Sequence, residues 1–263
     1  MPVVVAIIPA RYASSRLPGK PLAEIAGKPM IQHVCERAAA SRLAHRVLVA
    51  TDDDRIASAV RAFGGEAVMT AASHATGTDR LAEAAAHCNA DIVVNVQGDE
   101  PLLDPSWIDA VAGALLADPE LPMATLSLPL TSTDEMLASS VVKVVTDARD
   151  DALYFSRSPI PHVRSEASAD PRTPAERSVE RGLARRHVGL YAYRRDALFR
   201  FAALPRSPLE EAEALEQLRA LHHGMRIRVV PVTGSVSVAV DTPEDLERAR
   251  ALLHKDTRRD GIS

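Results

Sequence analysis

The chain has 263 residues, of which 46% are hydrophobic and 25% charged, and its formal net charge is −4. This length and composition are typical of a globular protein with a sizeable core, and the absence of a basic excess argues against nucleic acid as a partner. Any anion that the protein binds must therefore meet a local group of Arg and Lys side chains.

Cysteine usage and hydropathy indicate the compartment. Cys35 and Cys88 are too few for a disulfide framework or a four-thiolate zinc site, and Cys35 lies on the apolar stripe of an expected helix, as a small buried hydrophobe would. The chain starts with a strand-like run, and no apolar stretch approaches the roughly 20 residues that span a bilayer. We expect a cytoplasmic protein with no membrane partner.

In the first half of the chain, short β-rich runs alternate with helical periodicity. The expected pairs of strand and helix are Val3–Ile8 with Pro29–Ser41, Arg46–Thr51 with Asp54–Phe63, and Asp91–Gln97 with Pro105–Ala117. Apolar strands joined by crossover helices predict a parallel sheet that is covered on both faces. Ligands bind at the carboxyl ends of such strands, so the residues that follow each strand are the first candidates for a site.

The second half has a different pattern, which predicts an antiparallel or mixed extension of the sheet. Its expected strands are Met123–Leu130, Val141–Asp147, Ala152–Arg157, His187–Arg194, Ile227–Val232 and Val236–Val240, and its expected helices are Asp196–Ala203, Leu209–His223 and one from Pro243. The stretch His162–Arg186 has no periodicity and is predicted as an exposed loop or mobile insertion. We expect one domain over residues 1–253, with an inserted lobe at about 131–190 and a frayed polar tail at 254–263.

The segment after the first strand carries three cations, Arg11, Arg16 and Lys20, together with small residues such as Ser14. Forked Arg donors and accessible backbone N–H groups are what a triphosphate requires. Pro21 excludes a Walker A loop, in which Ser or Thr follows the Lys, and the glycines of a dinucleotide fingerprint are missing. The alternative interpretation is three solvated surface cations.

Two carboxylates follow later strands. Asp99 comes after Gly98, whose lack of a side chain allows another group to approach closely, and Mg²⁺ is commonly held by one or two such carboxylates with substrate phosphates. Thr242, Pro243 and Asp245 fit a helix N-cap, a first-turn Pro and a capping acid, which leaves Asp241 without a capping role. Simple turn chemistry remains an alternative for both carboxylates.

Further polar residues lie at element ends and on one strand face. Arg80 falls in the first turn of an expected helix, where the helix dipole disfavours a cation unless an anion is near. Alternation places His187, Gly189, Tyr191 and Tyr193 on one face of a strand, as in the wall of a sugar pocket or in a half-exposed strand. On the later helix, Glu213, Glu216, Gln217 and Ala220 form a stripe that is usually solvated.

Taken together, these segments resemble the 3-deoxy-manno-octulosonate cytidylyltransferases, or CMP-Kdo synthetases. The main runs are IPARYASSRLPGKPL (8–22), TGTDRLAE (76–83), VNVQGDEP (94–101) and VDTPEDLERAR (240–250), with support from YFSRSPIP (154–161), HVGLYAYR (187–194) and PLEEAEALEQLR (208–219). The resemblance covers nearly the whole chain in the expected order and fades at 162–186 and in the last ten residues.

The resemblance implies an α/β fold of the nucleotide-diphospho-sugar transferase type, with a Rossmann-like mixed sheet and a smaller inserted dimerisation lobe. It implies a homodimer that uses Mg²⁺ and transfers CMP from CTP to Kdo, giving CMP-Kdo and pyrophosphate for lipopolysaccharide biosynthesis.

The resemblance also assigns roles by position. Lys20, Arg16, Asp99 and Asp241 are the expected catalytic residues, with Asp99 and Asp241 as metal ligands. The expected nucleotide contacts are Ala10, Arg11, Ser14, Arg16, Lys20, Arg80 and Gln97. The expected sugar contacts are Gln97, Arg157, His187, Tyr191, Glu216 and Gln217.

Three alternatives stay open at this point. The chain could use another acceptor, such as a sialic acid or methylerythritol phosphate. It could be a non-catalytic nucleotide-binding module, although such a module would not need Lys20 together with both carboxylates. It could also be a glycosyltransferase, which shares strand-end carboxylates but releases no pyrophosphate.

Overall fold

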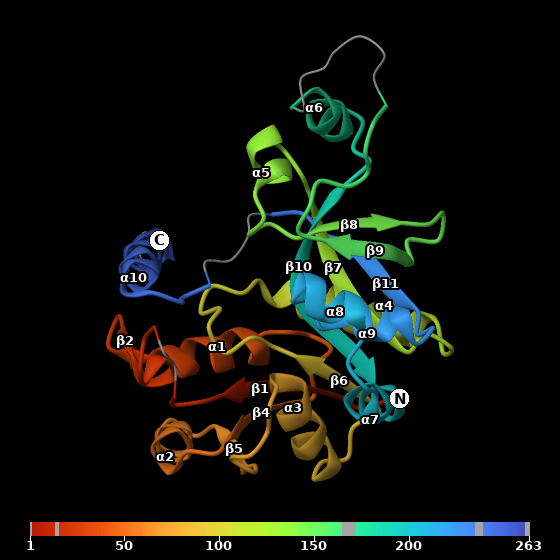
Figure 1. Cartoon of the computed structure of the whole chain (residues 1–263). Helices are drawn as coiled ribbons and strands as arrows, with labels where there is room; N and C mark the ends of the chain where they lie inside the picture. Colours follow the sequence, from red (N-terminus) through yellow and green to blue (C-terminus); the bar gives the residue numbers. More distant parts are fainter. Residues whose placement is uncertain (1, 14–15, 165–171, 235–238, 261–263) are drawn as a thin grey trace. The chain divides into compact units, whose positions relative to one another are not determined.

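The computed structural model describes residues 2–13, 16–164, 172–234 and 239–260 (Figure 1). The chain divides into two compact units, residues 1–113 with 237–263, and residues 114–236. The boundary falls within helix α4 (Pro105–Ala117). The predicted lobe at 131–190 lies inside the second unit, and the description of residues 1–253 as one domain stays a prediction.

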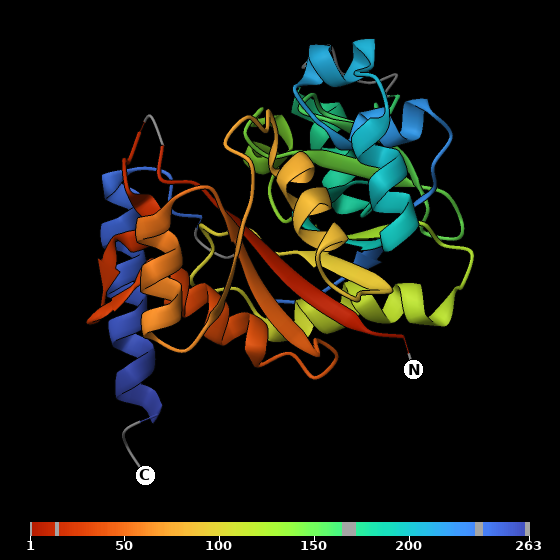
Figure 2. The same ribbon diagram turned by 90° about the horizontal axis from the view of Figure 1, so that it is seen from below.

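The first unit is built on parallel strands. Their order is β6 (Ile92–Asn95), β1 (Val4–Ala10), β4 (Arg46–Thr51) and β5 (Glu66–Met69). The helices between them are α1 (Met30–Ala39), α2 (Asp54–Ala62) and α3 (Gly77–Ala86). Figure 2 shows α3 on the opposite face of these strands from α1 and α2, as right-handed crossovers require when the strand order reverses. Because β1 and β6 pair in parallel, their carboxyl ends lie side by side. Helices cover both faces of these strands, as predicted.

Helix α1 shows how the apolar stripe forms its element. Met30, Ile31, Val34, Cys35 and Ala38 recur at helical spacing, and all five are buried. Burial, with the nearby charge of Glu36, raises the pKa of the Cys35 thiol to about 12. Cys35 is free and buried, so its predicted role as a small core residue is confirmed, and Cys88 is also free and buried.

Helix α10 (Pro243–Asp260) packs on a hairpin that follows the first loop. This hairpin pairs β2 (Glu24–Ile25) with β3 (Lys28–Pro29) after the 3-10 turn η1 (Lys20–Leu22). Leu246, Ala249 and Leu253 join Ile25 and Met30 in one apolar cluster. α10 extends to Asp260, so it continues into the segment where a frayed tail was expected. Among the described residues, no helix combines the length and apolarity needed to cross a bilayer.

The second unit carries a mixed sheet, as its pattern predicted. Strand β7 (Met123–Pro129) pairs in parallel with β11 (Ile227–Pro231) and antiparallel with β10 (Arg185–Arg194). Strand β8 (Lys143–Thr146) pairs antiparallel with β10 and with β9 (Ala152–Ser156). The helices of this unit are α5 (Thr133–Leu137), α6 (Arg172–Glu180), α7 (Arg195–Ala203), α8 (Pro208–Glu213) and α9 (Gln217–His222).

Three expectations for the second half need correction. The segment predicted as a loop contains helix α6, which buries Ala175 against α5 in a cluster with Met136. The single helix expected at Leu209–His223 is two short helices, because Ala214 adopts the left-handed conformation (φ 50°) that ends α8. The strand expected at Val236–Val240 lies mostly outside the described residues, and Ala239 and Val240 are not in a strand.

Gly98 allows the chain after β6 to approach the end of β1. A Cβ atom built on Gly98 would lie 2.9 Å from the carbonyl oxygen of Pro9, which is closer than real Cβ atoms come. Gly98 was predicted to allow another group to approach closely, and this is confirmed. The group is the backbone of β1 at Pro9.

We expect Gly98→Ala to lower the free energy of unfolding by about 1–3 kcal/mol, the usual cost of overpacking, because a backbone atom must move. The matched control is Gly113→Ala in α4, where the added Cβ would lie 4.0 Å from Leu43. That control should be neutral or stabilise by about 0.5–1 kcal/mol, as Ala does in a helix interior. Urea unfolding of both variants measures the difference, and equal effects would contradict the assigned role of Gly98.

Candidate active site

The loop after β1 is closed by one glycine. The Gly19 N–H donates to the carbonyl oxygen of Tyr12 at 3.0 Å, and Gly19 has a φ of 70°, which disfavours any residue with a side chain. A Cβ on Gly19 would also lie 3.2 Å from the Tyr12 ring, whose face is covered by the Arg55 guanidinium at 3.3 Å. This closure starts η1 at Lys20, so the backbone that carries the Lys20 side chain is tightly held.

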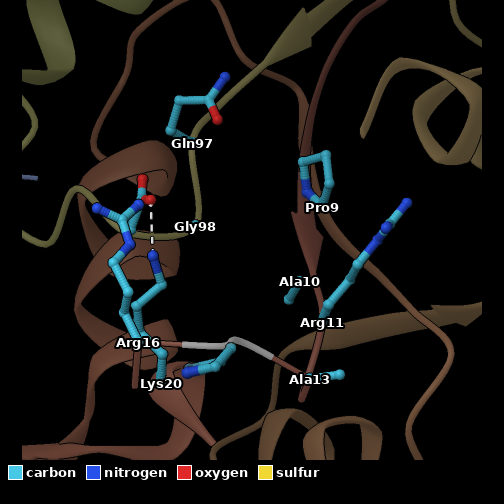
Figure 3. A pocket seen from close by; sticks show the side chains of 10 residues that line it. Pro9, Ala10, Arg11, Ala13, Arg16, Lys20, Gln97 and Gly98 are labelled. Atoms are coloured by element: carbon cyan, nitrogen blue, oxygen red, sulfur yellow. Dashed lines mark hydrogen bonds and ion pairs between the residues drawn. The ribbon is translucent and has the colours of Figure 1, made fainter. Parts of the chain in front are cut away.

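An open pocket of about 350 Å³ lies at this loop (Figure 3). Its lining comes from the end of β1, the loop to η1 and the chain after β6, namely Pro9, Ala10, Arg11, Ala13, Arg16, Lys20, Pro21, Gln97, Gly98 and Asp99. In Figure 3 the side chains of Arg16 and Lys20 run in the same direction, whereas Arg11 extends away from them. The structure thus gathers most of the predicted nucleotide contacts in one pocket, while Ser14 lies outside the described residues.

At the rim of this pocket, the Lys20 ammonium is held between two carboxylates. Lys20 Nζ lies 2.8 Å from Asp99 Oδ2 and 3.1 Å from Asp241 Oδ1, and Arg16 lies 3.2 Å from Asp241 Oδ2. The Lys20 side chain is only 15% exposed. Burial opposes its charge, but attraction and hydrogen bonds from Asp99 and Asp241 outweigh burial and raise the pKa of Lys20 above its usual value.

Backbone contacts hold the two carboxylates together. The Val240 N–H donates to the carbonyl oxygen of Asp99 at 2.8 Å, which ties the chain after β6 to the start of α10. Thr242 and Asp245 exchange hydrogen bonds across the first turn of α10, so the predicted capping pair is present. Because these two residues satisfy the helix start, the Asp241 side chain has no capping role, as expected, and it faces Lys20 and Arg16.

The same carboxylates are candidates for holding a metal. In the described part of the chain, no group of three or more His, Cys, Asp and Glu side chains is placed to hold a metal ion. Asp99 and Asp241 converge on one ammonium nitrogen, so they already share a cation position. Two protein carboxylates with the remaining ligands from phosphate and water are typical of Mg²⁺. The donor set therefore fits a divalent cation that arrives with a phosphate substrate.

Arg11 is tied to a neighbouring loop. Its NH2 group donates to the carbonyl oxygens of His74 at 2.8 Å and Thr76 at 3.0 Å. The same loop is held from its other side by Glu83, which pairs with His74 and accepts from the Ala71 N–H. Arg11 thus fixes the loop before α3, and its predicted phosphate contact stays a prediction.

Arg80 has a different environment from the one its sequence position suggested. It is fully buried, lies 3.0 Å from Asp52 Oδ2 and donates to the Thr70 hydroxyl at 2.5 Å. A cation in the first turn of a helix requires a nearby anion, and for Arg80 that anion is the carboxylate of Asp52. The position of Arg80 on α3 no longer argues for a nucleotide contact, and that assignment stays a prediction from resemblance.

The predicted sugar residues other than Gln97 lie in the second unit, where Arg157 has the densest contacts. Its guanidinium donates to the carbonyl oxygens of Glu213 at 2.7 Å, Ser139 at 3.1 Å and Ala214 at 3.5 Å. The Glu213 carboxylate accepts from the Arg157 N–H at 2.9 Å and from the Ser156 hydroxyl at 2.6 Å. Glu213 was assigned to a solvated stripe, so its role in orienting Arg157 was missed.

Lys143 was also missed. Its side chain is fully buried, and its ammonium donates to the carbonyl oxygens of Ala138, Val141 and Arg157 at 2.9, 2.6 and 2.5 Å. A Lys between two pairs of Val in the run VVKVV (141–145) was the available signal, because a cation inside an apolar strand needs buried acceptors.

His187 and Tyr191 lie together in an aromatic row on β10. Their ring centroids are 5.5 Å apart, and His187 meets Phe155 edge-on at 4.9 Å. The Thr125 hydroxyl lies 3.0 Å from His187 Nε2 and from the carbonyl oxygens of Val188 and Leu190. This hydroxyl has one proton, so it can donate to one of these three neighbours at a time. Burial lowers the pKa of His187 to about 3.

Glu216 and Gln217 lie where α9 begins, after the break at Ala214. Gln217 is buried, and Glu216 lies 3.5 Å from Arg219, which forms a buried ion pair with Glu210 at 2.6 Å. The stripe expected to be solvated is therefore partly packed into the second unit, since Gln217 and Ala220 are buried.

Comparisons with known proteins agree with each other. The sequence profile of the Cytidylyltransferase family matches residues 5–227. The 3-deoxy-manno-octulosonate cytidylyltransferase of Syntrophotalea carbinolica is 58% identical over 250 residues, covering 95% of this chain and 98% of the relative. That of Geobacter metallireducens is 57% identical over 245 residues, covering 93% and 95%.

A solved structure of CMP:2-keto-3-deoxy-manno-octonic acid synthetase complexed with CTP is similar with a TM-score of 0.87 and 48% identity, covering 97% of this chain and 99% of that one. The predicted α/β fold of the nucleotide-diphospho-sugar transferase type is therefore confirmed.

The environment of His187 predicts a pH dependence of stability. A folded-state pKa near 3, against about 6.5 in an unfolded chain, means that only the unfolded state gains the proton as the pH falls. Stability should therefore decline below pH ~6.5, by at most about 1.4 kcal/mol per pH unit from this residue. His187→Gln, which can keep the bond to Thr125, should flatten that decline in urea unfolding between pH 4 and 8, whereas exposed His222→Gln should follow the unsubstituted protein. Parallel curves for all three proteins would refute the assignment.

Proposed function

Because the chain belongs to the family of 3-deoxy-manno-octulosonate cytidylyltransferases, we propose that it transfers the cytidylyl group of CTP to the anomeric hydroxyl of Kdo and releases pyrophosphate. The observation within the molecule that supports this most directly is the convergence of Lys20 with Asp99 and Asp241 beside the pocket at the end of β1. A pure nucleotide binder would not need that combination. The product is CMP-Kdo for lipopolysaccharide biosynthesis.

The reaction joins two anions, so the protein must neutralise charge and fix geometry. Arg16 and Lys20 line one pocket and extend in the same direction, which suits the phosphate groups of CTP (Figure 3). Charge that develops on departing pyrophosphate would be met by donors already in place, and preorganised donors of this kind are usually the largest electrostatic contribution to catalysis. Ala10 and Gln97 supply the remaining described pocket contacts for the nucleotide.

Cytidylyltransferases of this kind generally use a divalent metal, and Mg²⁺ is the proposed ion here. Asp99 and Asp241 would hold it, since both carboxylates already face one cation. When bound, such an ion neutralises phosphate charge and lowers the pKa of a coordinated hydroxyl. The two carboxylates keep their orientation through the Val240–Asp99 backbone bond and the Thr242–Asp245 cap.

For the acceptor, Arg157 is the proposed partner of the Kdo carboxylate. Its three bonds to carbonyl oxygens use one N–H on each guanidinium nitrogen, so within the described residues the second N–H on both terminal nitrogens is left for a ligand. A guanidinium fork suits a carboxylate. His187, Tyr191, Glu216 and Gln217 stay proposed sugar contacts, and homodimerisation and a cytoplasmic location stay predictions.

The acceptor is tested by pyrophosphate release with CTP and Mg²⁺ and one acceptor at a time. Kdo should support turnover, whereas a sialic acid and methylerythritol phosphate should give rates near background. Turnover with one of those two and not with Kdo would replace the proposed acceptor. Tight CTP binding with no pyrophosphate release for any acceptor would favour a non-catalytic module.

Asp99→Asn should reduce kcat on the order of 10²–10³-fold, the scale for loss of one preorganised electrostatic element. The substitution keeps the size of the side chain but removes the charge that holds both Lys20 and the metal. Asp54→Asn, at an exposed carboxylate in the first turn of α2, is the matched control and should retain full activity. Steady-state kinetics with saturating CTP and Kdo measure both, and near-normal turnover of the Asp99 variant would remove this residue from the metal site.

A further inference from the structure

The ammonium of Lys20 occupies the position at which the two carboxylates converge. Its nitrogen lies within hydrogen-bond distance of Asp99 Oδ2 and Asp241 Oδ1 at the same time, at 2.8 and 3.1 Å. Lys20 also lines the pocket that Arg16 and Arg11 share. The Lys20 ammonium can therefore pair with two kinds of anion, which are the two carboxylates in the free protein and a phosphate group of a nucleotide bound in the pocket.

The charges at this position balance in the free protein. Asp99 and Asp241 carry two negative charges, and Lys20 and Arg16 carry two positive charges in direct contact with them. A dication added alone would face both cations and would have to displace Lys20 from the carboxylates. A triphosphate added alone would draw Lys20 away and leave the two carboxylates with Arg16 as their remaining cation in this group. When metal and nucleotide bind together, the metal compensates the carboxylates and Lys20 compensates part of the triphosphate charge.

We propose that Lys20 is a resident counter-cation, which holds the metal position in the free protein and transfers to the triphosphate when metal and nucleotide bind. The proposal rests on the proposed function, since it assumes that Asp99 and Asp241 are the metal ligands. Metal and nucleotide then favour each other's binding, because each relieves the unfavourable charge left by the other. The consequence is a free protein that binds a divalent metal weakly.

The local structure explains why Lys20 rather than Arg16 has this role. The Lys20 side chain is 15% exposed and touches both carboxylates, whereas Arg16 is 63% exposed and touches only Asp241. Exposed ion pairs are strongly screened, so Arg16 contributes less to the local field. The Gly19–Tyr12 bond and η1 hold the backbone at Lys20. Transfer of the ammonium therefore needs only rotations of a long, flexible side chain.

The test is the affinity of the free protein for Mn²⁺ alone, measured by electron paramagnetic resonance of unbound Mn²⁺ without nucleotide. Lys20→Met should bind Mn²⁺ at least tenfold more tightly than the unsubstituted protein, because the competing cation is gone. Lys20→Gln should also bind Mn²⁺ more tightly, and its amide can still donate to Asp99 and Asp241. This second variant keeps the test valid if Lys20→Met does not fold. Arg16→Gln should give a smaller gain.

Lys28→Met is the matched control, because it removes the same charge from an exposed pair with Glu36 in the same unit. Its Mn²⁺ affinity should change less than twofold. If Lys20→Met and Lys20→Gln leave the affinity unchanged or weaken it, or if Lys28→Met tightens it equally, the counter-cation role is refuted.

A third set of variants separates this inference from the proposed metal site. Asp99→Asn should weaken Mn²⁺ binding and, combined with Lys20→Met, should abolish the gain. If the double variant keeps tight binding, the metal lies elsewhere and the proposed site fails. If Asp99→Asn weakens binding while Lys20→Met has no effect, the metal site stands and only the role of Lys20 is wrong.

Discussion

The contact of Lys20 with Asp99 and Asp241 joins three segments that are far apart in the sequence, and the arrangement of the candidate site depends on it. Like charges as close as these two carboxylates repel, so they can share one position only if a cation lies between them. The surrounding backbone supports the arrangement: Gly98 permits close approach to β1, Val240 bonds to Asp99, and the α10 cap occupies Thr242 and Asp245.

The partly or fully buried cations of the protein pair with two kinds of acceptor, backbone carbonyl oxygens and carboxylates. In the second unit, Lys143 and Arg157 donate to backbone carbonyl oxygens. These bonds fix the backbone segments that carry the carbonyl groups against the two side chains. In the first unit, Lys20 pairs with carboxylates, which a divalent cation can take over. Arg80 and Arg219 also pair with carboxylates, but only Lys20 of these three lines the pocket, so it is the one placed to exchange partners during a reaction.

Much of the site could be predicted because it depends on local patterns. Position at the end of an apolar strand identified the cation loop and Asp99, and capping chemistry singled out Asp241 by elimination. Both patterns act over a few residues, so they are visible in one sequence. The break at Ala214 and helix α6 could not be predicted in this way. Each depends on contacts with distant residues, such as Met136 against Ala175, which outweigh a weak local preference.

The sequence by itself determined the class of chemistry: an α/β sheet, a cation loop after its first strand and two candidate carboxylates, Asp99 and Asp241, with the family resemblance naming CTP and Kdo. Only the tertiary structure decided which partner each charged side chain has. Buried Arg80 pairs with Asp52, Arg11 holds the loop at His74, and Lys20 lies between the carboxylates. The physical reason is that hydrophobic periodicity and caps are local, whereas the partner of a charge depends on which distant groups share its low-dielectric surroundings.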